Sequence, residues 1–317
     1  MLFNNVFEVN GFNQICRIDF IKSQYVTIKK NNRTNSLYYS LNKYDTPYLI
    51  SNAIVQISDK KNLDNIFQYM EYILVPFILN IDTLSKNLED LKGTIESFSS
   101  HGFHKSTFLL NYSEDFYDDQ IIDVFKTTNR LEKIVFFNSP VDINVEGRIW
   151  FLTRGLNSFN RSKHDFVCNI TLFTESQAHH TYFNRKLYIG PNGEIKNAPE
   201  CEETFGYIQD LESPEQLKEI VQTPAFQKYW YVHKEICDVC KDCEFRHMCV
   251  DNRLPYQRSE NEWYHKTECN YNPYIAKWKG EEGYRTLAEC GVISNHEGFT
   301  IDHEKIAAIN EELWGEE

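Results

Sequence analysis

The chain has 317 residues, of which 41% are hydrophobic and 15% aromatic. This length and composition predict a globular protein with two or three domains, each with a core of its own. The net charge of -13 excludes a general binder of nucleic acids or anionic membranes, because phosphate contacts require clustered Lys and Arg. The longest apolar run, residues 72–79, is interrupted by a proline and is far shorter than the ~20 residues that cross a bilayer. We therefore expect a cytoplasmic protein without membrane contacts.

Two runs near the start of the chain alternate between apolar and polar residues, at 15–20 and 26–29. Period-two alternation predicts strands, here an antiparallel hairpin with one solvated face. Helices are expected at 37–41 and at 63–72, where Asn62 is a candidate cap and apolar residues recur at helical spacing. The N-terminal part is therefore predicted to be a small α+β unit.

Four short apolar runs then suit strands that are buried on both faces: 106–110, 133–137, 148–152 and 166–171. An amphipathic helix is expected between the first two runs, at 118–125. Alternation of strand and helix favours a largely parallel sheet, because parallel strands require covering helices. The middle of the chain is therefore predicted to be of α/β class.

A hairpin is predicted over 182–196, because Pro191-Asn192-Gly193 is a strong turn signal. Ser213 followed by a proline is typical of a helix start. The last helix is expected to begin after Asp302, which has a side chain suited to capping. Three further helices are expected in this part of the chain: 213–222, 223–233 and 274–279.

Five of the nine cysteines lie between Cys237 and Cys269. Thiolates this close together lie on one or two turns, where a single metal ion or cluster can bind them and a distant cysteine can complete the set. The ligand types alone fit structural zinc as well as iron–sulfur, with His247 or His265 as a nitrogen ligand to zinc. A disulfide framework is disfavoured, because the N-terminus has neither the basic nor the apolar segment of a secretory signal.

The spacing Cys240-x2-Cys243-x5-Cys249, with Cys269 further on, resembles the second auxiliary-cluster half of a SPASM domain. SPASM domains are C-terminal extensions of many radical SAM enzymes that modify peptides. Upstream, residues 188–195 resemble the hairpin that leads into such a domain. The resemblance implies that four cysteines hold one 4Fe-4S cluster: Cys240, Cys243, Cys249 and Cys269.

The chain departs from the full SPASM pattern at two places. Arg253 stands where the pattern has a further cysteine, four residues after Cys249. A Gly-x4-Cys segment is also missing, since Gly193 and Cys201 are eight residues apart. A first auxiliary cluster is therefore not expected, and Cys201 and Cys237 are extra or alternative ligands.

The motif that binds the SAM-cleaving cluster, Cys-x3-Cys-x2-Cys, is absent, because only Cys16 and Cys168 precede Cys201. We therefore expect no SAM cofactor and no autonomous radical SAM activity. A chain of this kind resembles the SPASM-domain peptide maturases of grasp-with-spasm systems. The resemblance implies an accessory maturase whose partners are a ribosomally made precursor peptide and an ATP-grasp ligase. A zinc-stabilised adaptor that binds a peptide, and a redox enzyme that modifies the peptide itself, are the alternatives.

The resemblance also implies three parts within an α/β chain. Residues 1–85 resemble a winged-helix-like lobe, which recognises a peptide by adding it as a strand to a sheet edge. Residues 86–200 resemble a degenerate, partial βα barrel of radical SAM type. Residues 201–317 would form the Cys-rich, SPASM-like cluster domain.

Overall fold

The fold is seen in a computed structural model, which describes these residues of the chain: 5–8, 15–19, 27–29, 49–56, 63–73, 77–80, 88–103, 106–114, 123, 125, 128, 131–153, 155, 166 and 170–315. They form a mixed α/β protein, as the sequence predicts. The chain divides into two units, which are described separately. Unit 1 combines Met1–Asp45, Asn160–Tyr182 and Tyr229–Glu317, whereas unit 2 combines Thr46–Phe159 and Phe183–Lys228.

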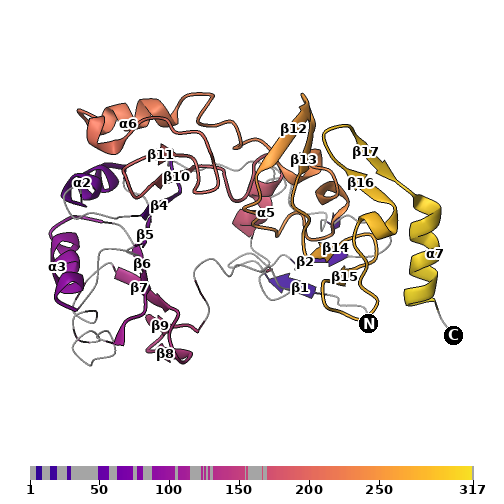
Figure 1. Cartoon of the computed structure of the whole chain (residues 1–317), viewed down its shortest axis with the longest axis horizontal. Helices are drawn as coiled ribbons and strands as arrows, with labels where there is room; N and C mark the ends of the chain where they lie inside the picture. The colour runs from indigo at the N-terminus through magenta and orange to yellow at the C-terminus, as the bar shows by residue number, and fades with distance from the viewer. Residues whose placement is uncertain are drawn as a thin grey trace. The chain divides into compact units, whose positions relative to one another are not determined.

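Unit 2 is built on an eight-stranded sheet with the strand order β11-β10-β4-β5-β6-β7-β9-β8 (Figure 1). From β10 to β9 neighbouring strands run parallel, and β11 and β8 each pair antiparallel at one edge. The order has two ends, so the described strands form an open sheet. The strands are β4 (Asn52–Gln56), β5 (Phe77–Asn80), β6 (Ser106–Asn111), β7 (Leu131–Phe137), β8 (Ile143–Val145), β9 (Ile149–Phe151), β10 (Lys186–Ile189) and β11 (Ile195–Lys196).

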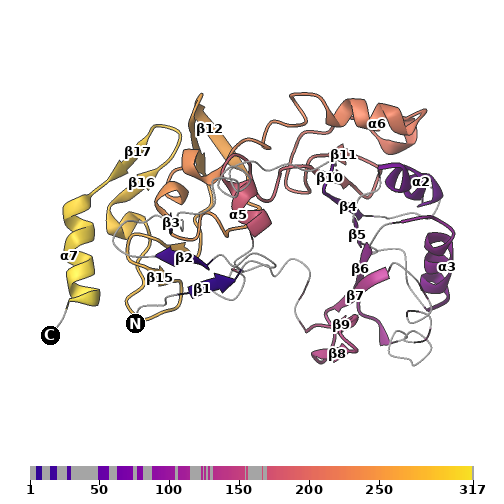
Figure 2. The same cartoon turned by 180° about the vertical axis from the view of Figure 1, so that it is seen from behind.

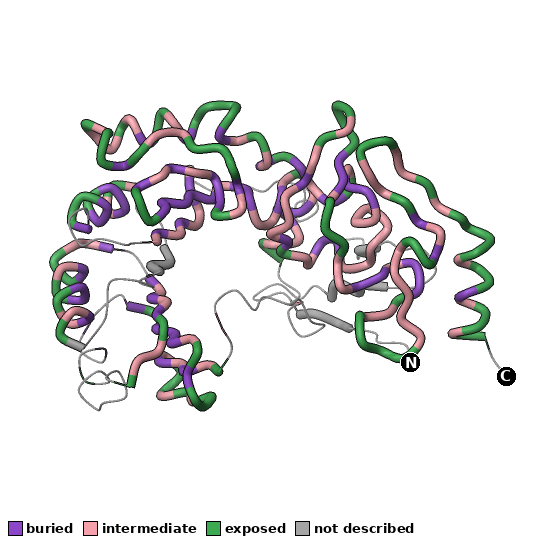
Figure 3. The backbone as a smooth tube through the Cα atoms, in the orientation of Figure 1, coloured by how far each residue is buried: buried purple, intermediate pink, exposed green. Residues whose placement is uncertain are grey.

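Two helices, α2 (Leu63–Ile73) and α3 (Leu88–Ser99), lie on the same side of this sheet (Figure 1). Three fully buried aromatic rings join them to it. The ring of Phe98 on α3 packs edge-on against Phe67 of α2, with ring centres 5.9 Å apart, and against Phe108 of β6 at 5.2 Å. Buried residues therefore gather between the helices and the sheet (Figure 3), which is where parallel strands require cover.

The helix α6 (Pro214–Val221) begins at the predicted place, with a proline in its first turn. Ser213 precedes it but makes no capping hydrogen bond with its side chain. Instead Gln216 accepts a hydrogen bond from the backbone of Glu212 at 2.7 Å. The start of this helix is therefore held by the proline and by a side chain from inside the helix.

The described residues of unit 1 form a three-stranded antiparallel sheet of order β1-β2-β3, three hairpins and the α-helices α5 and α7 (Figure 2). The predicted hairpin at 15–20 and 26–29 is confirmed as β2 and β3. The elements are β1 (Asn5–Glu8), β2 (Ile15–Asp19), β3 (Thr27–Lys29), α5 (Ile170–Ser176), β12 (Pro255–Ser259), β13 (Glu262–His265), β14 (Tyr271–Asn272), β15 (Lys277–Trp278), β16 (Val292–Ser294), β17 (Phe299–Ile301) and α7 (His303–Trp314). As predicted, Asp302 caps α7 by accepting a hydrogen bond from the backbone of Lys305 at 2.9 Å.

Two helices that the sequence predicts, at 223–233 and at 274–279, do not form. The segment 223–233 forms turns, because its buried Trp230 and Val232 lie two residues apart, a spacing that no single helix face provides. The segment 274–279 does not form a helix either, because residues 273–276 make the turn after β14 and Lys277–Trp278 is the strand β15. Ala276 has a φ of 51°, which a helix does not accommodate. Both errors arise from packing that a local pattern does not show.

The strand predicted at 166–171 is also wrong at its last two residues, since α5 begins at Ile170. The hydroxyl of Thr174 donates to the carbonyl of Ile170 and that of Ser176 to the carbonyl of Phe173, both at 2.7 Å. These polar side chains satisfy themselves within the helix and are buried, so their polarity does not mark a solvated face.

Several sequence-based expectations lie outside the described residues or stay predictions. The helix at 37–41 and most of that at 118–125 fall on residues that the structure does not describe. The division into 1–85, 86–200 and 201–317 stays a prediction beside the two units. Among the helices described, none has the length and apolar character that a bilayer crossing requires.

Replacing Phe98 by alanine should destabilise the protein by about 3–5 kcal/mol, because it leaves a cavity between α2, α3 and β6. The measurement is denaturant unfolding followed by circular dichroism. Glu96→Ala on the exposed side of the same helix is the matched control. Equal loss of stability in both variants would contradict this account of the core.

Candidate metal centre

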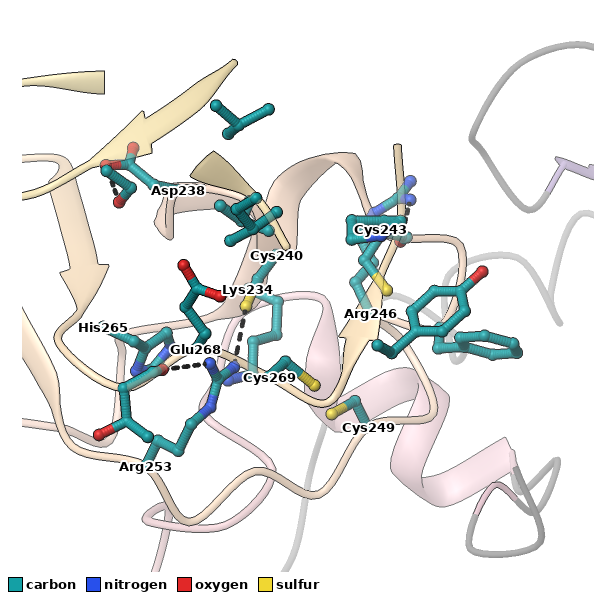
Figure 4. A pocket seen from close by; sticks show the side chains of 18 of the residues that line it. Lys234, Asp238, Cys240, Cys243, Arg246, Cys249, Arg253, His265, Glu268 and Cys269 are labelled. Carbon is teal, nitrogen blue, oxygen red and sulfur yellow. Dashed lines mark hydrogen bonds between the residues drawn. The ribbon is translucent and has the colours of Figure 1, made fainter. Parts of the chain in front are cut away.

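The four cysteines of the predicted ligand set line one cavity of unit 1, with a volume of about 130 Å³. They come from two parts of the chain: the turns after residue 236 supply three of them, and Cys269 follows β13. Figure 4 shows their side chains directed into the same space. None of the four is in a disulfide. The fold therefore brings together the residues that the sequence grouped only by spacing: Cys240, Cys243, Cys249 and Cys269.

The first of these cysteines follows a strained turn. Val239 has a φ of 63° and a ψ of -48°, and the backbone N–H of Cys240 donates to the carbonyl of Asp238 at 2.6 Å. This is a γ-turn, which is costly for a β-branched residue and persists only where the surroundings hold it. The Asp238 carboxylate is held by Arg258 of β12 and by the hydroxyl of Ser294 of β16. Two hairpins thus fix the backbone that presents Cys240.

The distances between possible ligand atoms bear on the kind of metal. Four thiolates on one tetrahedral zinc, each about 2.3 Å from the metal, lie about 3.8 Å apart. Among the described residues, however, the group whose ligand atoms all lie within 4.8 Å of one another is Cys240, Asp251 and His265. The four thiols do not form such a group. A 4Fe-4S cluster holds its thiolates farther apart, because each one binds a different iron.

A buried ion triad lies beside the cysteines. Lys234 Nζ is 2.6 Å from Asp251 Oδ2, and Arg253 Nη2 is 2.7 Å from the same oxygen. The Lys234 and Asp251 side chains are only 4% and 1% exposed. Arg253 Nη2 also lies 3.6 Å from the sulfur of Cys240. Two cations share one carboxylate, so the triad itself carries a net positive charge, which is complementary to thiolates.

The charges of this triad support one another. Burial alone would raise the pKa of the Asp251 carboxyl, but Lys234 and Arg253 outweigh it and hold the pKa well below its usual range. Burial would likewise lower the pKa of Lys234, and Asp251 together with the neighbouring cysteines raises it instead. Burial and the two cations lower the pKa of His265 to about 3, so this imidazole is neutral at physiological pH.

The group of Cys240, Asp251 and His265 does not fit a cation of its own. Both oxygens of Asp251 already accept hydrogen bonds from Lys234 or Arg253. A divalent ion there would face two fixed positive charges a few ångströms away, a strongly unfavourable arrangement. We therefore interpret Asp251 as the anion that orients the two cations, rather than as a ligand.

The histidines considered as zinc ligands differ in their surroundings. His265 lines the cavity, with Nδ1 3.1 Å from the carbonyl of Leu254. Its Nε2 is buried and has no hydrogen-bond partner among the described residues. His247 is not among the residues that line the cavity, and its Nδ1 lies 3.0 Å from the Ser176 hydroxyl. Of the two, only His265 faces the cysteines.

Aromatic rings form another part of the cavity wall. Phe166 stacks on Phe245 with ring centres 4.6 Å apart, and Phe245 meets Tyr271 edge-on at 5.0 Å. All three residues line the cavity. The Tyr271 hydroxyl donates to the carboxylate of Glu244, so the polar end of this ring is satisfied. These rings exclude water from their part of the cavity, and so they lower the local dielectric.

The remaining described cysteines lie elsewhere. Cys237 is fully buried with Val232 and Trp263, and its sulfur lies 3.6 Å from the carbonyl of His233. Burial raises the pKa of Cys237 to about 12 and that of Cys201, which belongs to unit 2, to about 11. Neither of them lines the cavity, so neither lies with the four grouped cysteines. Cys168 lies outside the described residues.

Sequence reasoning missed the ion triad beside the cysteines. Arg253 stood out only as a residue in place of a cysteine, and Lys234 and Asp251 carried no signal. A lysine and an aspartate seventeen residues apart match no helix or strand spacing. The one clue is that Asp251 and Arg253 follow closely after Cys249.

Comparison of the chain with protein-family models, with curated proteins and with solved structures found no match. The function proposed below accordingly rests on the cysteine spacing and on the geometry of the cavity. Both belong to unit 1.

Replacing Asp251 by alanine should destabilise the protein by about 3–5 kcal/mol, because Lys234 and Arg253 would lose their shared anion while still buried. The midpoint of denaturant unfolding measures the effect. Glu312→Ala removes the carboxylate of an exposed pair with Arg285 and should cost less than about 1 kcal/mol. Similar losses from both substitutions would show that the buried triad does not stabilise the fold.

Proposed function

We propose that this chain is an iron–sulfur protein of SPASM type that serves as an accessory maturase for a ribosomally made peptide. The observation that carries the proposal is the convergence of four cysteines on one cavity, at the spacing of an auxiliary-cluster site. Their thiols would hold one 4Fe-4S cluster: Cys240, Cys243, Cys249 and Cys269.

The chemistry of the wall supports a cluster over a single zinc ion. The four thiols are not among the groups of described residues whose ligand atoms all lie within 4.8 Å of one another, whereas a tetrahedral zinc holds its thiolates about 3.8 Å apart. Lys234 and Arg253 place positive charge beside Cys240, which suits an anionic group. Burial raises the pKa of the Cys243 thiol well above its usual range, so this residue becomes a thiolate only when a bound metal replaces its proton.

Each part of the chain has a role in this proposal. A 4Fe-4S cluster supplies one-electron chemistry or a rigid anchor when it is bound. The residues around it hold its ligands, balance its charge and exclude water. The Asp238 carboxylate, held by Ser294, fixes the turn before Cys240. The Arg246 side chain donates to the carbonyl of Cys243 at 3.1 Å. No SAM is required.

The partners follow from the same proposal. The N-terminal strands β1 to β3 would belong to a winged-helix-like lobe that binds the precursor peptide by strand addition. The open parallel sheet of unit 2 would be a degenerate partial barrel of radical SAM type. The second partner would be an ATP-grasp ligase, and the site of action the cytoplasm, where thiols stay reduced.

Anaerobically purified protein should contain iron and acid-labile sulfide at a ratio near that of a 4Fe-4S cluster, with little zinc. Cys243→Ala should lose the iron, because it removes one of the four ligands. Cys201→Ala, a change at a cysteine outside the cavity, should keep it. Stoichiometric zinc in the wild-type protein would instead favour the zinc-stabilised adaptor.

The immobilised protein should retain its precursor peptide and the ATP-grasp ligase in a pull-down from purified components. If neither is retained, the accessory role is wrong.

A second candidate, a redox enzyme that modifies the peptide itself, is favoured by the contact between Arg253 and Cys240. It requires that reduction of the centre by dithionite be coupled to a change in peptide mass.

A further inference from the structure

We infer that Arg253 raises the reduction potential of the proposed centre. It acts as a positioning residue, through the sulfur of Cys240. The inference rests on the proposed function, because it concerns a cluster held by the four cysteines. It starts from one contact, in which Arg253 Nη2 lies 3.6 Å from Cys240 Sγ (Figure 4). In a full SPASM pattern this position would itself carry a cysteine.

The guanidinium of Arg253 is held on three sides. Its Nε and Nη2 donate to Asp251 at 3.0 and 2.7 Å, and its Nη1 donates to the carbonyl of Thr267 at 2.8 Å. The backbone N–H of Arg253 also donates to Asp251, at 3.0 Å. The planar fork therefore cannot turn away from Cys240 without breaking several bonds.

The charges within the triad beside Cys240 do not cancel one another. Lys234 and Arg253 contribute two positive charges, and Asp251 contributes one negative charge. Reduction of an iron–sulfur cluster adds one electron from the reductant, and so it adds one negative charge without making or breaking a bond. A fixed positive charge and a hydrogen bond to a ligand sulfur stabilise the more negative state, which raises the reduction potential.

The surroundings of Arg253 keep this effect from being screened by solvent. Its side chain is 19% exposed, and those of Lys234 and Asp251 are nearly inaccessible. The rings of Phe166 and Phe245 cover another part of the same cavity. Salt and water weaken charge effects mainly at exposed sites, so they screen the triad less than they would a pair on the surface.

The test is a reductive titration of the loaded protein with dithionite, followed by electron paramagnetic resonance, with iron and sulfide measured on each sample. Arg253→Gln should lower the ratio of reduced to oxidised centre about tenfold at a given potential, a shift of about 59 mV to more negative values for one electron. Arg253→Lys keeps the charge beside Asp251 but loses the fork, and so it should shift in the same direction by less.

Arg285→Gln is the matched control, because it removes an arginine of unit 1 whose exposed pair with Glu312 lies outside the cavity. Its potential should equal that of the wild type. If Arg253→Gln does not fold, Arg253→Lys decides. Loaded Arg253 variants with the wild-type potential would overturn this inference alone. Folded variants that no longer bind iron would also overturn it, because Arg253 would then be needed to hold the centre. Wild-type protein without iron and sulfide would overturn the proposed function as well.

Discussion

The buried triad of Lys234, Asp251 and Arg253 is the constraint on which the organisation of the cysteine-rich unit depends. Lys234 and Asp251 are almost inaccessible and Arg253 is largely covered, so these charges are tolerated only as a set, because removing one partner leaves another charge buried and uncompensated. The triad joins the turn before the first cysteines to the segment after Cys249. Through Arg253 it also reaches Thr267, two residues before Cys269. It therefore connects the separate stretches of chain that supply the thiols.

A second polar hub, Asp238, acts on the backbone instead of on the sulfur. It accepts hydrogen bonds from Arg258 of β12 and Ser294 of β16, and its own carbonyl closes the γ-turn at Val239. Strain of this kind persists where the surrounding structure over-determines the backbone, and it often lies at functional positions. Here it fixes the residue next to Cys240. Two of the short hairpins of unit 1, those that contain β12 and β16, thus hold the backbone at the cavity wall.

In unit 2, apolar packing rather than buried charge holds the elements together. The parallel strands from β10 to β9 are covered on one side by α2 and α3, with Phe67, Phe98 and Phe108 between the layers. The strands β8 and β11, which pair antiparallel with their neighbours, form the two edges of the sheet. The aromatic content that marks this chain as globular is used in both units, as a core in unit 2 and as the wall of a polar cavity in unit 1.

The sequence by itself determined the mixed α/β class, the strands β6, β7, β9, β10 and β11 of unit 2 and the capped last helix, because these depend on periodicity and on local turn and capping residues. It did not predict β4, β5 or β8. It did determine which four cysteines to group. Only the tertiary structure decided that they share a cavity, that Cys237 belongs to a hydrophobic core, and that the helices expected at 223–233 and 274–279 do not form. The Lys234–Asp251 pair belongs with these, because charges brought together by folding leave no pattern along the chain. Long-range pairing and burial are properties of the packed chain, and no local spacing encodes them.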